Sequence, residues 1–330
     1  MSGRVLVSGA NGFIGSAVVR ALLRHGYPVC ALARPSSGTA NLDGLDVEIV
    51  RGDLLDPASL EGALRNCEGL FHVAADYRLW VRDPHEIRRA NVRGTHNILL
   101  AAQRCGVRRT VHTSSVATLG LHQDGTPSDE DTPVHLGDMI GAYKRSKFLS
   151  EALVRRFARK GNDIVIVNPA APVGPRDRKP TPTGRMILDA ARGRMPAFVD
   201  TGLCVVHVDD VAEGHVLAYE LGQRGRRYAL GGENMSLKAI LAAVAELSGR
   251  RAPWLQLPHA AVLPVAYAAE ALARVTGVAP NVTVDGVKLS RHRMYFSSRR
   301  AETELGYRAR PAREALADAI QWFRDNGYLG

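Results

Sequence analysis

The chain has 330 residues, of which 45% are hydrophobic and 23% are charged, proportions typical of a folded globular protein and not of a disordered one. Its formal net charge of +10 comes mostly from arginines scattered along the whole length, with no dense basic block, which argues against a nucleic-acid partner. A basic chain can also favour encounters with an anionic cofactor, an anionic substrate or an acidic membrane surface, but general solubility is the preferred explanation of this charge.

Four cysteines, Cys30, Cys67, Cys105 and Cys204, lie far apart and form neither a CxxC pair nor a metal-ligand pattern. They are expected to be buried thiols in a reducing compartment. The sequence enters a strand pattern at once, and no apolar run reaches the ~18 residues that a membrane-spanning helix needs. We therefore expect a cytoplasmic protein without a metal site or a spanning segment.

Strand-like and helix-like stretches alternate through the first half of the chain. Short β-branched runs predict strands at 4–8, 29–33, 47–50, 69–73, 109–114 and 163–168. Apolar residues at helical spacing predict helices at 13–26, 57–67, 86–106 and 143–161. This alternation predicts an α/β fold, a doubly wound parallel sheet with helices on both faces.

The character changes after about residue 175, where prolines cluster in 172–184. The patterns that follow predict short strands and mainly helices, the helices within 184–193, 205–222, 236–249, 263–277 and 312–327. We expect a larger domain at residues 1–175 and a smaller, mainly helical substrate lobe at residues 176–330, partly interleaved with the first.

A glycine-rich turn, "GANGFIG", joins the first predicted strand to the first predicted helix. Such a turn lets the backbone approach a pyrophosphate closely and directs free N–H groups of the helix N-terminus toward it. Its spacing of three and three differs from the commonest dinucleotide fingerprint, and a plain tight turn is the alternative. The residues predicted to bind a dinucleotide here are Gly9, Asn11, Gly12, Phe13, Ile14 and Gly15.

The residue after the second predicted strand is Arg34, followed by Pro35 and two serines, with no acidic residue at the strand tip. An acidic residue there would bind ribose hydroxyls, whereas arginine suits a 2′-phosphate, so NADP is favoured and NAD remains possible. Asp53, which precedes Leu54 after the third strand, could reach the adenine amine. The alternatives are a solvated arginine and a turn or N-cap aspartate.

Tyr143 and Lys147 stand one helical turn apart in "YKRSK", on the same face of a predicted helix. A nearby ammonium group is expected to lower the pKa of the phenol from its ordinary value of ~10 and thereby make it a proton donor and acceptor. The same lysine could bind a ribose hydroxyl. Ser114 and Ser115, at the end of the fifth strand, could hydrogen-bond a substrate oxygen. On spacing alone, a surface charge pair is the alternative.

With these motifs in place, the chain resembles the extended short-chain dehydrogenase/reductase (NAD-dependent epimerase/dehydratase) family, which has a Rossmann-type fold. The resemblance covers nearly the whole chain and lies in "GANGFIG", "RGDLLD", "HVAA", "NVRGTHNILLAA", "HTSSVATLG", "YKRSK", "NPAAPVGP", "VHVDDVA" and the C-terminal "AETELGYRARPAREALADAIQWF". Within the family the chain is most similar to hopanoid-associated sugar epimerases and somewhat less to dihydroflavonol 4-reductases.

The resemblance implies specific roles. Tyr143 would be the general acid/base, Lys147 its pKa partner and a ribose ligand, and Ser115 the group that polarises the reacting carbonyl, with Ser114 as its close competitor. The residues expected around the cofactor are Ala74 and Ala75 after the fourth strand, Pro169 near the nicotinamide, and Asn91 near the lysine.

One departure bears on the substrate. Family members that act on nucleotide sugars carry an Arg-Asp pair ahead of the "HV.D" segment, where this chain has Leu203 and Cys204. A nucleotide-diphosphate sugar is therefore not favoured, unless Arg176 or Arg185 replaces that arginine.

We expect an NADP(H)-dependent oxidoreductase that interconverts a secondary alcohol and a ketone, with a sugar, polyol or lipid-linked compound as substrate. The alternatives are a sugar epimerase that uses bound NAD(P) transiently and a dinucleotide sensor without activity. The apolar stretch 257–277 could contact a lipid-like substrate or a membrane surface, or be a core helix. The helices at 85–105 and 141–160 correspond to the family's dimer face, which predicts a homodimer.

Overall fold

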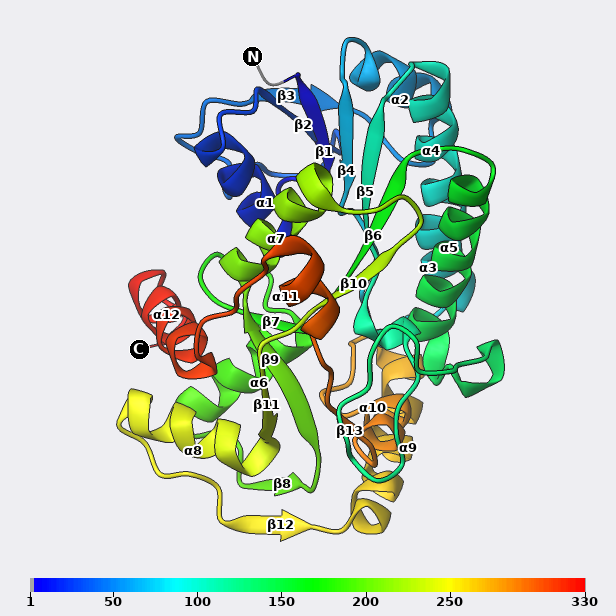
Figure 1. The fold of residues 1–330 in the computed structure, drawn as a ribbon. Coiled ribbons are helices and arrows are strands. Elements are labelled where there is room, and N and C mark those ends of the chain that lie inside the picture. Colours follow the sequence, from blue (N-terminus) through cyan, green and yellow to red (C-terminus); the bar gives the residue numbers. More distant parts are fainter. Residues whose placement is uncertain (1–2, 330) are drawn as a thin grey trace.

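The computed structural model describes residues 3–329 and contains a seven-stranded sheet in the order β10-β6-β5-β4-β1-β2-β3 (Figure 1). Every neighbouring pair in it is parallel. Its strands are β1 (Val5–Ser8), β2 (Val29–Ala33), β3 (Glu48–Arg51), β4 (Gly69–His72), β5 (Arg109–Thr113), β6 (Ile164–Pro169) and β10 (Arg227–Leu230). The predicted doubly wound Rossmann-type sheet is confirmed, and its outer strand β10 comes from the second half of the chain.

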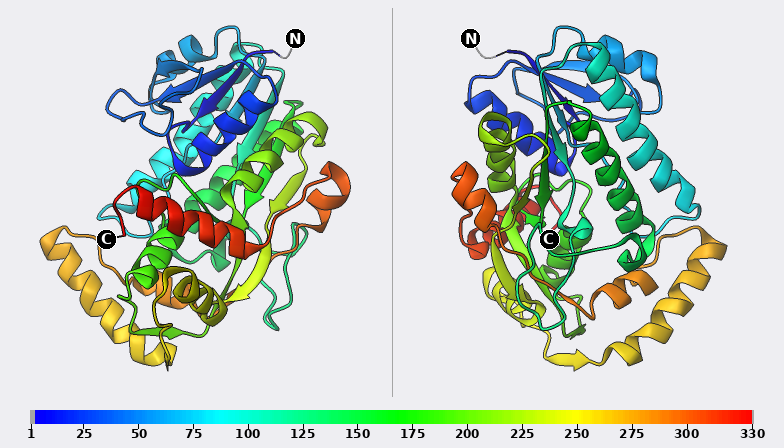
Figure 2. Two further views of the ribbon diagram at one scale, coloured as in Figure 1. Left: turned by 90° about the vertical axis from the view of Figure 1, so that its left-hand side faces the viewer. Right: turned by 45° about the vertical axis from the view of Figure 1, so that its right-hand side comes forward.

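Helices cover both faces of this sheet, as the right-hand view of Figure 2 shows. One face carries α1 (Phe13–Arg24) and α7 (Val208–Leu221), and the other carries α2 (Pro57–Leu64), α4 (Gly94–Arg104) and α5 (Gly141–Arg159). Successive residues of β1 serve opposite faces, because Val5 and Val7 belong to the core under α1 and α7 while Leu6 packs with α2 and α4. This explains why the strands are continuously apolar.

The predicted helix at 86–106 is divided into three parts. A short helix, α3 (Pro84–Arg88), leads into one π-helical turn, η1 (Arg89–Arg93), and then into α4. A π-turn inserts an extra residue into the helix and changes the direction of the side chains around it, and such turns are frequent at functional sites. The buried residue of this turn is Asn91.

The smaller part of the molecule is built around β9 (Gly202–His207), which pairs with β7 (Ala171–Val173), β11 (Glu233–Ser236) and β13 (Arg293–Met294). Three helices pack a second apolar core against it: α6 (Pro182–Ala191), α8 (Leu237–Ser248) and α12 (Ala312–Asp325). A two-stranded ribbon of β8 (Ala197–Val199) and β12 (Leu255–Leu257) leads to α9 (His259–Thr276) and α10 (Val284–Leu289).

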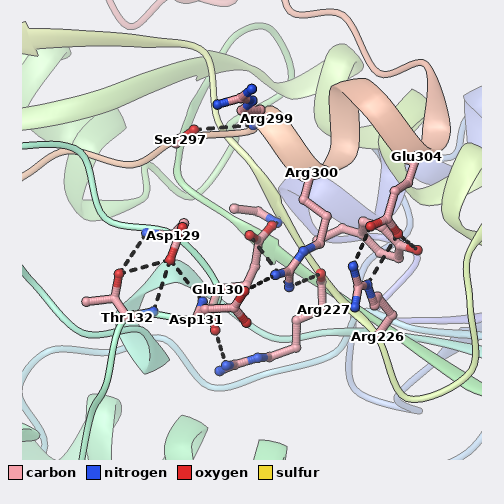
Figure 3. Close-up of polar contacts among 12 residues, drawn as sticks. Asp129, Glu130, Asp131, Thr132, Arg226, Arg227, Ser297, Arg299, Arg300 and Glu304 are labelled. Carbon is pink, nitrogen blue, oxygen red and sulfur yellow. Dashed lines mark hydrogen bonds and ion pairs between the residues drawn. The ribbon is translucent and has the colours of Figure 1, made fainter.

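A cluster of charged residues fastens the long connection between β5 and α5, which holds the short turns η2 (Val116–Thr118) and η3 (Leu136–Asp138), to β10 and α11 (Arg299–Leu305) (Figure 3). Glu130 accepts a hydrogen bond from the Ala229 N–H at 2.6 Å, and Arg227 donates to its carbonyl oxygen. Arg300 lies 3.7 Å from the Glu130 carboxylate and also pairs with Asp131. The connection is therefore held at its middle to the edge of the large sheet.

Candidate active site

The turn between β1 and α1 forms a cradle that only glycine permits. Gly9 has a φ of +69°, and a Cβ added there would lie 2.7 Å from the Ala74 Cα. A Cβ on Gly15 would lie 2.0 Å from the Gly9 carbonyl oxygen. The helix begins at an N-cap glycine, Gly12, without a side-chain cap, which leaves its first N–H groups for a ligand. These features fit the pyrophosphate of a dinucleotide.

The other residues of this turn support the cradle. Asn11 Nδ2 donates to the Gly38 carbonyl oxygen at 2.7 Å, and the Asn11 carbonyl oxygen accepts from Asn41 at 3.2 Å. The Asn11 side chain thus ties the turn to the loop after β2. Phe13 and Ile14 are partly buried and pack against the core beneath α1. The side chains of these three residues therefore hold the turn in place, and only backbone groups here are free to face a ligand.

Two arginines meet at the carboxyl ends of β2 and β3. Arg34 is exposed and directly follows β2, while Arg51 lies opposite Ala33 in the register of the two strands. Arg51 Nη1 donates to the carbonyl oxygens of Arg34, at 3.1 Å, and Ser37, at 3.0 Å. Sequence reasoning missed Arg51, although an arginine at the end of the strand next to β2 was a usable signal.

Asp53 lies beyond the end of β3 and is half-buried. One of its carboxylate oxygens accepts from the Leu55 N–H at 2.8 Å, so the aspartate acts as the turn residue that was considered as the alternative to an adenine ligand. Leu54 is half-buried, and its side chain lies close to Gly94 of α4.

Residues expected near the nicotinamide half lie at the ends of neighbouring strands. Ala74 and Ala75 follow β4 and are half-buried, and the Ser8 hydroxyl accepts from the Ala74 N–H at 3.3 Å. Pro169 ends β6, is buried, and lies opposite Leu230 of β10. The carboxyl ends of parallel strands share one edge of a sheet, so these residues border the same edge as the glycine cradle.

Lys147 is almost completely buried on α5. Its ammonium group donates a hydrogen bond to the Thr113 carbonyl oxygen at 2.8 Å. Burial lowers the pKa of Lys147 to about 8, partly opposed by the nearby charge of Glu151. Lys147 is thus fixed against the end of β5.

Tyr143 lies one turn before Lys147 and is close to Ser115. Burial of the phenol raises the pKa of Tyr143 above its ordinary value, and a hydrogen bond from the Ser115 hydroxyl lowers it in part. The expectation that Lys147 lowers this pKa is therefore wrong for the structure as it stands. The physical reason is that desolvation of the phenolate outweighs the neighbouring dipole, while the ammonium group is directed at a backbone carbonyl.

Ser114 and Ser115 differ in what binds their hydroxyls. Ser114 Oγ donates to the buried Glu151 carboxylate at 2.6 Å. Ser115 Oγ accepts from the Ala117 N–H at 3.1 Å, and Ser115 is half-buried. The Ser114 hydroxyl is therefore committed to the protein interior, whereas the Ser115 hydroxyl lies near the Tyr143 phenol.

Glu151 is a residue that sequence reasoning missed. One of its oxygens accepts from Ser114, Thr118 at 2.7 Å and Asn168 at 2.9 Å, and the other accepts from Arg227 at 3.3 Å. Asn168 also donates to the Ser115 carbonyl oxygen at 3.0 Å. Its position one turn after Lys147, on the face of α5 that already carries Tyr143, was the available signal.

Asn91 joins the segment after β4 to α5. Its Nδ2 donates to Ser146 Oγ at 2.9 Å and to the Asp76 carbonyl oxygen at 2.9 Å, while its Oδ1 accepts from the Asp76 N–H at 2.7 Å. Ser146 precedes Lys147 in the chain. Asn91 thus lies beside the lysine's helix, placed there by the π-turn.

Asp177, in the proline-rich loop, is a second residue that sequence reasoning missed. It is 2% exposed and accepts from the N–H and hydroxyl of Thr181. Burial raises its pKa to about 6. The pKa of Tyr77, which follows β4, is raised mainly by burial and secondly by the negative charge of Asp177. The proline-rich loop and the segment after β4 therefore face each other.

Arg176 is already engaged within the protein. It pairs with Asp209 at the start of α7, and its carbonyl oxygen accepts from Asn41 at 3.1 Å. Its backbone has a φ of +76°, in the left-handed region. Arg185 is exposed on α6. An arginine held by an aspartate is poorly suited to replace the missing sugar-diphosphate ligand.

Comparison with known proteins places these features in a family. The model of the NAD dependent epimerase/dehydratase family matches residues 5–231. The chain belongs to this family. Its members, reductases, epimerases and dehydratases, are enzymes that use a nicotinamide dinucleotide, and the residues of the cradle fit that group.

Three similar proteins cover almost the entire chain. A Synechocystis protein named after dihydroflavonol 4-reductase is 46% identical over 98% of this chain and 95% of its own length. Sterol demethylase protein B of Methylococcus capsulatus is 39% identical over 98% and 99%, respectively. The crystal structure of gox2253 superposes with a TM-score of 0.90 at 51% identity over 100% of both chains.

Proposed function

We propose that the protein is an NADP(H)-dependent oxidoreductase that interconverts a secondary alcohol and a ketone. The observation that carries this proposal is that the Ser115 hydroxyl lies near the Tyr143 phenol, one turn from Lys147 and at the sheet edge that holds the glycine cradle. When bound, the nicotinamide supplies or accepts the hydride.

Each of the three side chains has a distinct part in the reduction. Ser115 donates a hydrogen bond to the substrate carbonyl and orients it. Tyr143 gives its proton to that oxygen and recovers one afterwards. The raised pKa of the buried phenol keeps this proton in place until the reaction. Lys147 binds ribose hydroxyls of the cofactor. In alcohol oxidation Tyr143 accepts the proton instead.

The contacts of the two serines support Ser115 over Ser114. The Ser114 hydroxyl is bound to Glu151, and replacing that bond by one to substrate would leave a buried carboxylate short of a donor. A Ser115→Ala variant should therefore lose turnover, whereas Ser114→Ala should mainly lose stability.

NADP is favoured over NAD because Arg34 and Arg51 meet where the adenosine ribose of a dinucleotide would lie, with no acidic residue from Arg34 to Ser37. The variant Arg34→Asp should lower the ratio of kcat/KM for NADPH to that for NADH at least about tenfold, the factor that corresponds to ~1.4 kcal/mol. Arg224→Asp, an exposed arginine before β10, is the matched control and should leave the ratio unchanged.

The deciding experiment follows the absorbance of NADPH with a panel of ketones that includes a dihydroflavonol and a sterol ketone, classes suggested by the names of the two relatives. Tyr143→Phe should keep NADPH binding, measured by fluorescence titration, and lose turnover by about 10²–10⁴-fold. Equal turnover by wild type and Tyr143→Phe would remove the proposed acid/base. Tight nucleotide binding without turnover of any compound would favour the sensor.

A second candidate is a sugar epimerase, the activity named by the family and by the resemblance to hopanoid-associated epimerases. Epimerisation keeps the nucleotide bound and consumes none, so a nucleotide that copurifies, identified by mass spectrometry, together with turnover in the absence of added NADPH would support it. The pairing of Arg176 with Asp209 does not favour a nucleotide-sugar substrate.

Three further proposals concern organisation. We expect residues 1–175 to bind the dinucleotide and residues 176–330 to select the substrate. A homodimer is expected through α4 and α5, to be tested by light scattering. A cytoplasmic location remains an expectation. Among the helices of residues 3–329, none has both the length and the apolarity to cross a bilayer.

A further inference from the structure

Helix α9 exposes an apolar strip along one side. Val265, Leu272, Val275 and the adjoining Val278 are between 59% and 81% exposed. Residues seven and ten positions apart fall on nearly the same side of a helix, so the first three form a continuous stripe. Smaller exposed apolar residues, Ala261, Pro264, Ala268 and Ala271, extend it at helical spacing. We call the four larger residues the α9 strip.

The opposite side of α9 is already packed. Ala266 is buried against Val284 and Val287 of α10, with Val262 and Leu263 beside them. The helix is therefore apolar on both sides, and only one side is covered. Helices of that kind are normally covered on both sides, and exposed apolar patches mark interaction surfaces. Figure 2 shows α9 as an outer element that projects from the smaller part of the molecule.

The exposed charges of the chain segment that contains the strip have one sign. Residues 249–282 contain four charged residues apart from histidine: Arg250, Arg251, Glu270 and Arg274. The three arginines are exposed, whereas Glu270 is half-buried and accepts from the Val284 N–H at 2.8 Å. Trp254, which precedes β12, is 86% exposed. Every exposed charge of this segment is thus positive, and the segment carries a tryptophan of the type that prefers membrane interfaces.

We infer that the α9 strip docks on the surface of an anionic lipid bilayer. An apolar helix side bordered by arginines matches such a surface, because valine and leucine side chains enter the acyl boundary while guanidinium groups stay among anionic headgroups. The helix lies in the interface and does not span it, in agreement with the finding that no helix within residues 3–329 is both long enough and apolar enough to cross a bilayer. The inference holds whatever reaction the protein catalyses.

Docking there would bring the candidate site close to the bilayer. Arg82, in the segment after β4, donates to the Arg274 carbonyl oxygen at 3.0 Å. Asp285 of α10 lies so near the start of α5 that a Cβ on Gly141 would be 2.6 Å from its carboxylate. The α9–α10 hairpin therefore contacts both chain segments that flank Tyr143, and a lipid-like substrate could enter from the membrane side.

Flotation of the full-length protein with lipid vesicles tests the inference. The wild type should float with vesicles of equal parts phosphatidylcholine and phosphatidylglycerol and much less with phosphatidylcholine alone. The variant Leu272→Glu/Val275→Glu should weaken binding at least about tenfold. Arg274→Gln should weaken it about fivefold, the factor for ~1 kcal/mol per basic residue, on anionic vesicles only. Leu221→Glu, a 58% exposed leucine on α7, is the matched control.

Circular dichroism melts of all variants show whether each is folded, and the exposed positions make unfolding improbable as a cause of lost binding. Absence of wild-type flotation with anionic vesicles would overturn the inference. So would equal flotation of wild type and Leu272→Glu/Val275→Glu. A wild-type dimer that this variant dissociates, seen by light scattering without any vesicle binding, would assign the strip to a second copy of the chain instead.

Discussion

Glu151 and the α9 strip are both exceptions to the usual distribution of side chains, in which charged groups are exposed and apolar groups are buried. Glu151 is a carboxylate that is 3% exposed, and the α9 strip consists of apolar side chains that are mostly exposed. The carboxylate is stabilised by four donors within the chain, from Ser114, Thr118, Asn168 and Arg227. The α9 strip is left mostly exposed by the residues within 3–329, which is typical of a surface that binds a partner.

The comparison indicates that the Glu151 region contributes to the stability of the fold and that the α9 strip contributes to binding. A buried charge with all its hydrogen bonds fixes the positions of its partners, and here two of those partners, Asn168 and Thr118, also contact the Ser115 carbonyl oxygen. An exposed apolar side chain adds little to folding and can be exchanged freely. Substitutions in the first region should therefore change the free energy of unfolding, and those in the second should change only binding.

The largest effect is expected for Glu151→Ala. Removal of the carboxylate takes the charge partner away from the largely buried Arg227 and one acceptor away from each of Ser114, Thr118 and Asn168, so the free energy of unfolding should fall by about 3–5 kcal/mol. Urea titration measures it. Glu246→Ala removes an exposed ion pair with Arg313 and should lower the free energy by less than ~1 kcal/mol.

Glu151→Gln separates structure from positioning. It keeps the volume and one carbonyl oxygen, so a folded variant with unchanged KM and reduced kcat would show that the network aligns Ser115. A Glu151→Ala variant as stable as the wild type would show instead that Glu151 carries no structural role, and the comparison of the two regions would fail.

Gly15→Ala should be next in size. The new Cβ would lie 2.0 Å from the Gly9 carbonyl oxygen, a backbone atom that cannot move without opening the turn, and the free energy of unfolding should fall by about 3 kcal/mol with loss of NADPH binding. Gly62→Ala in α2, where a Cβ meets no atom within 4 Å, should instead be neutral or stabilise by up to ~1 kcal/mol. Equal behaviour of the two variants would contradict the cradle.

The fold was predictable because its signals are local. Six of the seven strands of the large sheet are short β-branched runs bounded by turns, and the helix starting at Phe13 is amphipathic and follows a glycine turn. The seventh strand, β10, was missed, since Arg227–Leu230 contains no β-branched residue and its partner β6 lies about sixty residues away.

The residues of the candidate site could be proposed from the sequence, but their pKa values could not. Tyr143, Lys147 and Ser115 follow from spacing and strand ends, but the pKa of Tyr143 depends on how much water the folded chain excludes, which no spacing reveals. Asp177 escaped notice for the same reason, because its burial results from packing between the proline-rich loop and the segment after β4.

Asp177 gives stability a dependence on pH of about 2 kcal/mol. Its pKa is raised from 3.8 to about 6, so the folded state binds a proton more tightly than the unfolded state does. This contribution is present at low pH and is lost as the pH rises through about 4 to 6. Relative to Asp177→Asn, the wild type should therefore lose about 2 kcal/mol of unfolding free energy between about pH 4 and pH 7, measured by urea titration. A pH-independent difference would mean that the carboxyl titrates normally.

The smallest change in stability is expected in the α9 strip. Leu272→Gln replaces a side chain that is 64% exposed, so little apolar area returns to water on unfolding and the free energy should change by less than ~0.5 kcal/mol. Ala273→Gln, one position along, is the contrasting variant because Ala273 is 2% exposed, and a larger side chain there should destabilise by about 1–3 kcal/mol. The pair tests the two sides of one helix under identical conditions. If Leu272→Gln destabilised the protein as much as Ala273→Gln, the strip would be packed within the chain, and neither a bilayer nor a second copy would be needed to cover it.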